Sequence, residues 1–263
     1  MWAECAGYGA IAFLSRRAAR GNVGAGGASA LDSFTRAGGV EPLPIISFSD
    51  VLCVWAYFAE LRLAAVRRAF GDKVAFQHRF CPVFGDVPGK IAAGWARKGG
   101  YEGLADHVHH TARAFPELSL HPDIWRKIRP ASSLAPHIFL KAVEIAESEG
   151  ACAPGAFERG LIAVREGFFA HGLDIARRGV LFEIARGLGL DTAPVQALLD
   201  DGRAHAALSA DYKEAETLGV KGSPTLLLNE GRQKLFGNVG YRIIEANILE
   251  LLREPNPDQA SWC

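Results

Sequence analysis

The stretch between Leu43 and Phe80 constrains the fold more than any other part of the sequence. It opens with "LPIISF", which has the apolar character of a short buried strand, and it ends with "KVAFQHRF", which predicts a second strand. Between them, "VWAYFAELRLAAVRRAF" repeats apolar residues every three or four positions with arginines opposite, the pattern of an amphipathic helix. A strand, a helix and a strand in so short a stretch imply two parallel strands joined by a right-handed crossover.

The rest of the chain divides into a helical part and a return to strands. From Pro88 to about Leu218 the pattern is almost wholly helical, with Gly, Pro or Asp separating the helices. Strands are predicted again at 225–228 and 234–236, joined by the turn "NEGRQ", which favours an antiparallel hairpin, and the helix "YRIIEANILELLRE" follows. The order predicts an α/β fold, a mixed four-stranded sheet with helices on both faces and a large helical insertion.

We expect residues 43–87 and 219–254 to form one domain, residues 88–218 to form an inserted helical domain, and residues 255–263 to be a tail. Residues 1–42 are rich in Gly, Ala and Arg without sustained periodicity, which predicts a flexible extension. No basic residue precedes its weakly apolar start, which argues against a secretory signal and favours a cytoplasmic location. The arginines of the extension leave an organelle transit peptide open.

Composition limits the classes of partner. Hydrophobic residues make up 49% of the chain, enough for a sizeable core. Lysine plus arginine and aspartate plus glutamate each total 29, so the formal charge is zero and gives no reason to expect nucleic acid or an anionic membrane. No apolar run approaches the roughly eighteen residues that a membrane span needs. We therefore expect a small-molecule or protein partner, and a homodimer remains open.

Cys53 lies where the first predicted strand gives way to the first helix. Unpaired backbone amides and the positive end of a helix dipole favour a thiolate there, so we expect its pKa to lie below the usual value of about 8.5. A thiol with a lowered pKa is a nucleophile near neutral pH. The alternative is that Cys53 is simply a small buried apolar residue.

Cys81 follows the second strand, and parallel neighbours end at the same edge of a sheet, so Cys81 should lie near Cys53. We expect it to be a pocket-wall residue or, as the alternative, a resolving thiol, which requires alpha carbons within about 7 Å. The remaining cysteines are expected to be incidental surface thiols: Cys5, Cys152 and Cys263. His107 and His110 have no further ligand nearby, so no metal site is expected.

Two motifs carry a family resemblance. The "SDVLCVWAY" at the helix start and the "GSPT" before the hairpin resemble the DsbA-like branch of the thioredoxin superfamily, which carries S-D-x-x-C-P-W-C-Y and G-x-P-T in that order. The run "FFAHGLDIARRGVLFEIARGLGLD" is similar to the last part of that family's inserted helical domain. The resemblance covers about residues 43–253. It implies a thioredoxin fold with Cys53 as nucleophile, a cis Pro224 opposite it, and substrate binding by Ser223, Ser49 and Trp55.

Two departures from the family motif narrow the expected chemistry. Val54 stands where the family has proline, and Ala56 stands where it has the second cysteine. Without a thiol at position 56, the local disulfide of a dithiol oxidase cannot form. We therefore expect a monothiol thiol–disulfide oxidoreductase that works through mixed disulfides, with glutathione as a co-substrate and no tightly bound cofactor.

Two other classes of function stay open. The chain also resembles the kappa-class glutathione transferases and the 2-hydroxychromene-2-carboxylate isomerases, which activate the thiol of glutathione, generally with a serine near the helix start. Here Cys53 holds that place and Ser49 ends the strand. The third class is a non-catalytic binding module that has kept the fold and lost the chemistry.

Overall fold

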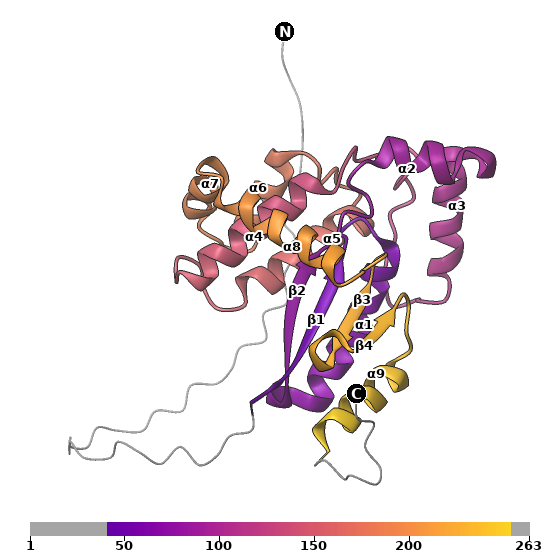
Figure 1. Cartoon of the computed structure of the whole chain (residues 1–263). Coiled ribbons are helices and arrows are strands. Elements are labelled where there is room, and N and C mark those ends of the chain that lie inside the picture. The colour runs from indigo at the N-terminus through magenta and orange to yellow at the C-terminus, as the bar shows by residue number, and fades with distance from the viewer. Residues whose placement is uncertain (1–40, 254–263) are drawn as a thin grey trace, which may run out of the picture. The chain divides into compact units, whose positions relative to one another are not determined.

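The computed structural model describes residues 41–253 (Figure 1). The predicted extension, except for its last two residues, lies outside the described residues, as do the predicted tail, Cys5 and Cys263. The elements in chain order are β1 (Leu43–Ser49), α1 (Val54–Phe70), η1 (Gly71–Lys73), β2 (Val74–Phe80), α2 (Val87–Gly94), η2 (Ala96–Lys98), α3 (Gly100–Ala112), α4 (Leu134–Ser148), α5 (Ala156–Phe169), α6 (Arg178–Gly187), α7 (Thr192–Asp200), α8 (Arg203–Thr217), β3 (Thr225–Leu228), η3 (Asn229–Gly231), β4 (Gln233–Phe236) and α9 (Tyr241–Leu252).

The four strands form one mixed sheet in the order β2-β1-β3-β4. The first two strands are parallel, with Ser49 opposite Phe80, as the strand–helix–strand pattern predicts. The third strand is antiparallel to both β1 and β4. The predicted thioredoxin-like sheet is confirmed, and β4 begins one residue earlier than expected, at Gln233.

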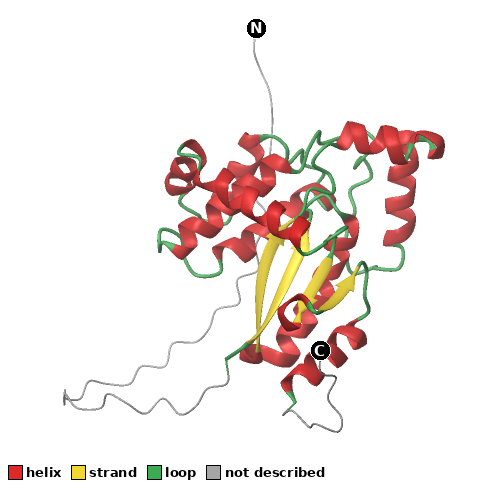
Figure 2. Ribbon diagram, viewed as in Figure 1, coloured by secondary structure: helices red, strands yellow, loops and turns green. Residues whose placement is uncertain are grey.

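Helices cover both faces of the sheet (Figure 2). On one face, Ile45 of β1 and Leu226 of β3 pack in a cluster with residues of α1 and α9. On the other face, Phe48 and Leu227 pack with Ala215 of α8. The alternation of side chains along each strand produces this division, because successive residues point to opposite faces.

The inserted segment supplies helices α2 to α8 and shares its core with the sheet domain. A single hydrophobic cluster runs from Val51 and Phe58 into the residues of α4 and α5. The stretch between α3 and α4, residues 113–133, is irregular where we expected helix. Three prolines in this stretch, Pro116, Pro122 and Pro130, explain the difference, because proline lacks the N–H that a helix interior requires. No helix in residues 41–253 is long and apolar enough to cross a membrane.

Asp211 on α8 joins the insertion to the edge of the sheet. Its Oδ2 accepts a hydrogen bond of 3.0 Å from the backbone N–H of Phe80, at the end of the edge strand β2. Its Oδ1 lies 3.2 Å from the buried ammonium of Lys141 on α4. Burial raises the pKa of Asp211, with Lys141 opposing the shift. The carboxylate therefore links two helices of the insertion to β2.

Replacing Asp211 with Ala should lower the free energy of unfolding by about 2 kcal/mol, since the buried N–H of Phe80 loses its acceptor and Lys141 keeps only its pair with Glu144. Denaturant unfolding followed by far-UV circular dichroism measures the change. The matched control is Asp200→Ala, which removes an exposed ion pair with Arg178 and should cause no measurable change. Equal unfolding midpoints for the two variants would contradict the role given to Asp211.

Candidate active site at the start of α1

Cys53 is the N-cap residue of α1, with extended backbone angles. Its N–H donates to the carbonyl of Asp50 at 3.1 Å, and its own carbonyl accepts the N–H groups of Ala56 and Tyr57 in the first turns of the helix. The side chain is only 5% exposed, and its Sγ donates to the carbonyl oxygen of Ser223 at 3.2 Å. The predicted position at the helix start is therefore correct, and the thiol points inward.

The expected lowering of the Cys53 pKa is wrong. Burial, the largest effect, raises the pKa, and the negative charge of Asp50 raises it further. The side-chain hydroxyl of Ser223 and the backbone N–H groups of Ala56 and Trp55 lower the pKa but do not outweigh burial. At neutral pH the site therefore holds Cys53 as a protonated thiol.

The loop before β3 lies against this thiol. The Ser223–Pro224 peptide bond is cis. The carbonyl of Ser223 accepts from Cys53, and the hydroxyl of Ser223 accepts from the backbone N–H of Asp50 at 2.9 Å. On the other side, the carbonyl of Pro224 accepts from the N–H of Gly237 at 2.8 Å. Hydrogen bonds thus join this loop both to the residues just before α1 and to the residue that follows β4.

Asp50 is fully buried and gathers donors from three separate parts of the chain. Its Oδ1 accepts from the N–H of Leu52 at 2.9 Å, and its Oδ2 accepts from the N–H of Phe84 at 2.7 Å and the hydroxyl of Ser133 at 2.8 Å. Burial raises the pKa of Asp50 to about 6, although these hydrogen bonds and the charge of Arg165 lower it. The carboxyl that accepts a hydrogen bond within the turn before Cys53 therefore titrates at about pH 6.

His137 of α4 lies beside Asp50 but does not form an ion pair with it. Its Nε2 accepts the N–H of Val51 at 3.2 Å and lies 3.7 Å from Oδ1 of Asp50. Burial lowers the pKa of His137 well below its usual value, so the ring is neutral. An accepting Nε2 leaves the proton on Nδ1, which can donate to the hydroxyl of Tyr212 at 3.0 Å.

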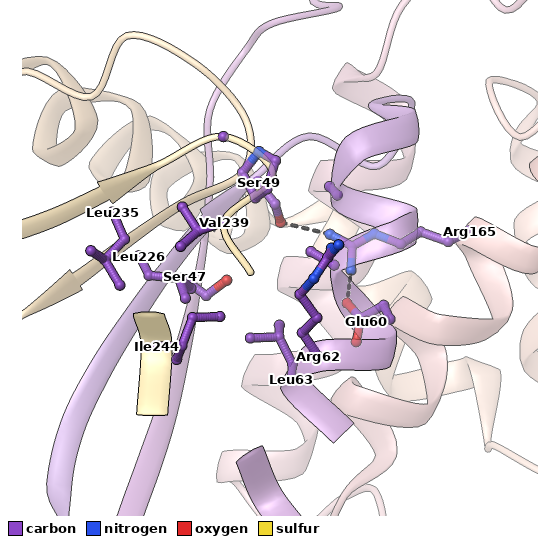
Figure 3. A pocket seen from close by; sticks show the side chains of 14 residues that line it. Ser47, Ser49, Glu60, Arg62, Leu63, Arg165, Leu226, Leu235, Val239 and Ile244 are labelled. Carbon is purple, nitrogen blue, oxygen red and sulfur yellow. Dashed lines mark hydrogen bonds and ion pairs between the residues drawn. The ribbon is translucent and has the colours of Figure 1, made fainter. Parts of the chain in front are cut away.

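The hydroxyl of Ser49 is hydrogen-bonded to the buried guanidinium of Arg165 and is therefore not available to a ligand. Figure 3 shows Arg165 of α5 bonded to Ser49 and Glu60 above a pocket between α1 and the sheet. The Ser49 hydroxyl accepts from Nη2 of Arg165 at 2.7 Å, and both side chains are buried. Ala56, at the position of the absent second cysteine, lines the same pocket together with Pro224.

Trp55 stands between the helix start and the insertion. It is half-buried, meets Phe58 edge-on with ring centroids 5.9 Å apart, and lies 6.5 Å from the ring of His107 on α3. His107 also lies 5.4 Å from the ring of Trp95. Within residues 41–253, no group of three potential ligands is arranged to hold a metal ion.

Cys81 lies at the carboxyl end of β2 as expected, buried with its Sγ 4.0 Å from the carbonyl oxygen of Gly222. The expectation for Cys152 is wrong, because this thiol is 8% exposed and packed in the core cluster after α4. The turn after α4 folds back on the helix, and the carbonyl of Ala146 accepts the N–H of Cys152. The local sequence around Cys152 indicates a loop but does not indicate that this loop is buried.

Sequence reasoning missed several residues that build the site: Asp50, Ser133, His137, Arg165 and Tyr212. Asp50 could have been selected, since it stands within the quoted motif three positions before Cys53. His137 and Arg165 carry a weaker signal, a polar residue within a largely apolar helical pattern, and Ser133 is the N-cap residue of α4.

Residues 44–248 match the model of a family described as the DSBA-like thioredoxin domain. A search of the curated proteins finds no match.

Solved structures with a similar fold include three with different descriptions. A "probable DsbA oxidoreductase" from Streptomyces coelicolor is 24% identical, with a TM-score of 0.61 over 84% of this chain and 99% of that one. The cytosolic disulfide reductase DsbM from Pseudomonas aeruginosa is 22% identical, with a TM-score of 0.58 over 80% and 100%. A 2-hydroxychromene-2-carboxylate isomerase is 17% identical, with a TM-score of 0.56 over 83% and 100%. At these identities the likeness concerns the fold.

Asp50 gives the site a characteristic pH dependence. The pKa of Asp50 is raised from its ordinary value of 3.8 to about 6 in the folded chain. Between these pH values the folded state therefore binds more protons than the unfolded state. The free energy of unfolding should therefore fall as pH rises from about 4 to 6, by about 3 kcal/mol from this group, and change little from it above that range. Thermal or urea unfolding of wild type and Asp50→Asn at each pH isolates the effect, because the variant lacks the titrating group.

The control for this measurement is Asp72→Asn, which removes an exposed carboxylate and should keep the wild-type pH profile. If Asp50→Asn and wild type had parallel profiles from pH 4 to 6, the carboxyl would not carry the raised pKa.

Proposed function

Because the chain belongs to the DSBA-like thioredoxin domain family, we propose that it is a thiol–disulfide oxidoreductase in which Cys53 is the nucleophile. One observation carries the proposal: the Cys53 thiol meets the Ser223 carbonyl at the start of α1, beside the cis Pro224. An extended substrate can pair with the backbone of Ser223 once the thiol leaves that carbonyl. The sulfur of the substrate then lies next to the sulfur of Cys53.

The reaction begins with loss of the Cys53 proton. The thiolate attacks one sulfur of a substrate disulfide, a Cys53–substrate mixed disulfide forms, and the other substrate sulfur leaves as a thiolate. The backbone N–H groups of Ala56 and Trp55 lower the pKa of Cys53 and stabilise the thiolate when it forms. The raised resting pKa makes this first step slow until the substrate rearranges the closed site.

We further propose that glutathione regenerates the reduced enzyme and that the reaction takes place in the cytoplasm. Ala56 supplies no second thiol within the motif, so a thiol from outside it must complete the cycle. DsbM, a fold neighbour, is described as cytosolic and has been solved with GSH, and those descriptions support the proposal. The proposed partners are a small thiol, a disulfide or a peptide; a homodimer stays a prediction.

The raised pKa of Cys53 favours a second candidate, a glutathione-dependent isomerase or transferase. A thiol that keeps its proton can donate a hydrogen bond to the thiolate of bound glutathione, as it donates to Ser223 in the resting state. Ser49 is less suited to this role, since its hydroxyl is held by Arg165.

Cys53→Ser should abolish reduction of a glutathione mixed-disulfide peptide, and the wild-type rate should rise with pH above neutral as the thiolate fraction grows. Turnover is followed by coupled oxidation of NADPH through glutathione reductase. Cys152→Ala is the matched control, since it removes a buried thiol outside the site and should retain wild-type turnover. If the turnover of Cys53→Ser equalled that of the wild type, the proposed oxidoreductase role of Cys53 would be contradicted.

Calorimetry with reduced glutathione separates the two candidates. For the oxidoreductase we expect weak binding of reduced glutathione, together with reaction of Cys53 with oxidised glutathione through an adduct of about 305 Da, the mass of one glutathionyl group, which acid quenching at early times captures. Tight binding with a Cys53 that forms no adduct would favour the isomerase or transferase. A chain that shows neither binding nor adduct would be a binding module.

A further inference from the structure

We propose that Cys81 is the second redox thiol of this site and forms an internal disulfide with Cys53. The proposal rests on the proposed function and names the group that resolves the mixed disulfide on Cys53. It would restore a two-thiol site in a chain whose motif holds one thiol, with the second supplied by the neighbouring strand.

The backbone brings the two cysteines to one point at the edge of the sheet. Ser49 and Phe80 are opposite each other at the ends of β1 and β2, and the N–H of Cys81 continues the ladder by donating to the carbonyl of Ser49 at 3.2 Å. Asp50 follows Ser49, and the turn that Cys53 closes on the Asp50 carbonyl brings the start of α1 back to this point. The backbone N–H groups of Cys81 and Cys53 are therefore held by two adjacent residues, Ser49 and Asp50 respectively.

The side chains converge on one loop. The Sγ of Cys53 lies 3.2 Å from the carbonyl oxygen of Ser223, and the Sγ of Cys81 lies 4.0 Å from that of Gly222, the preceding residue. Burial is the largest cause that raises the pKa of both thiols, the charge of Asp50 raises both further, and an ionised Cys53 also raises the pKa of Cys81. Charges act in this way over short distances, so the electrostatics agree with the shared loop.

Other thiols in the described residues do not share this position. Position 56 is alanine, and Cys152 lies after α4 in the insertion, packed against the core cluster. Cys53 and Cys81 are both free, so the structure represents the reduced pair.

The proposed step balances without a further reactant. Cys81 loses its proton, its sulfur attacks the Cys53 sulfur of the mixed disulfide, and the substrate sulfur leaves as a thiolate that takes up a proton. Over both steps the two cysteines lose two electrons and two protons, and the substrate disulfide is reduced to two thiols. A low-molecular-weight thiol such as glutathione then reduces the Cys53–Cys81 disulfide. Since burial raises the pKa of Cys81, the resolving step should be faster at higher pH.

The test follows the fate of the adduct in the full-length protein. Reduced wild type, Cys81→Ala and Cys152→Ala are exposed to oxidised glutathione at pH 8, quenched with acid at intervals, alkylated and mapped by peptide mass spectrometry. In wild type and Cys152→Ala we expect a Cys53–Cys81 disulfide and only a transient glutathione adduct on Cys53. In Cys81→Ala the adduct should persist at least about tenfold longer, because the resolving thiol is missing.

The outcomes are distinguishable. An adduct on Cys53 that persists equally in wild type and Cys81→Ala, with no Cys53–Cys81 peptide, would overturn the internal disulfide and leave the proposed function standing. No adduct on Cys53 in any of the three proteins would overturn both. Far-UV circular dichroism of Cys81→Ala checks its fold, and the mapped Cys53–Cys81 peptide in wild type supports or refutes the proposal without any variant.

Discussion

The buried carboxyl of Asp50 is the interaction on which the site depends. It accepts hydrogen bonds from the turn before α1, from the loop after β2 and from Ser133 at the start of α4, so one side chain fixes three segments that are distant in sequence. Hydrogen bonds to charged groups are each worth about 1.5–3 kcal/mol, which offsets part of the cost of burying the carboxyl. Neutral His137 accepts the backbone N–H of Val51 in the same turn.

The electrostatics of Cys53 follow from this arrangement. A helix start favours a thiolate, but that effect is worth typically less than about 1 kcal/mol, whereas burial of a charge costs several. With the thiol 5% exposed and a carboxyl nearby, burial prevails. The site is therefore closed in this structure, and in the proposed reaction the substrate takes the place of the thiol at the Ser223 carbonyl.

The strands, the first helix and the place of Cys53 could be predicted because each is encoded by local periodicity or by a short motif. The burial of Cys53 could not, because exposure is decided by segments far along the chain, as when Ser223 meets Cys53 across 170 positions. The link between Ser49 and Arg165 spans 116 positions and leaves no pattern in either neighbourhood. The sign of the thiol's pKa shift was missed for the same reason, since local sequence indicates the helix dipole but not the depth of burial.

The contact between Asp50 and Ser223 also bears on how the chain acquires its structure. These residues are 173 positions apart, with the whole helical insertion between them, so the loop and the helix mouth can meet only after most of the chain has collapsed. Contacts of such long separation form slowly. Until then Cys53, Cys81 and Cys152 are open to oxidants, whereas in the finished fold all three are buried. Non-native disulfides are consequently expected to form most readily while the chain folds. Burial of the three thiols in the native structure then limits their formation.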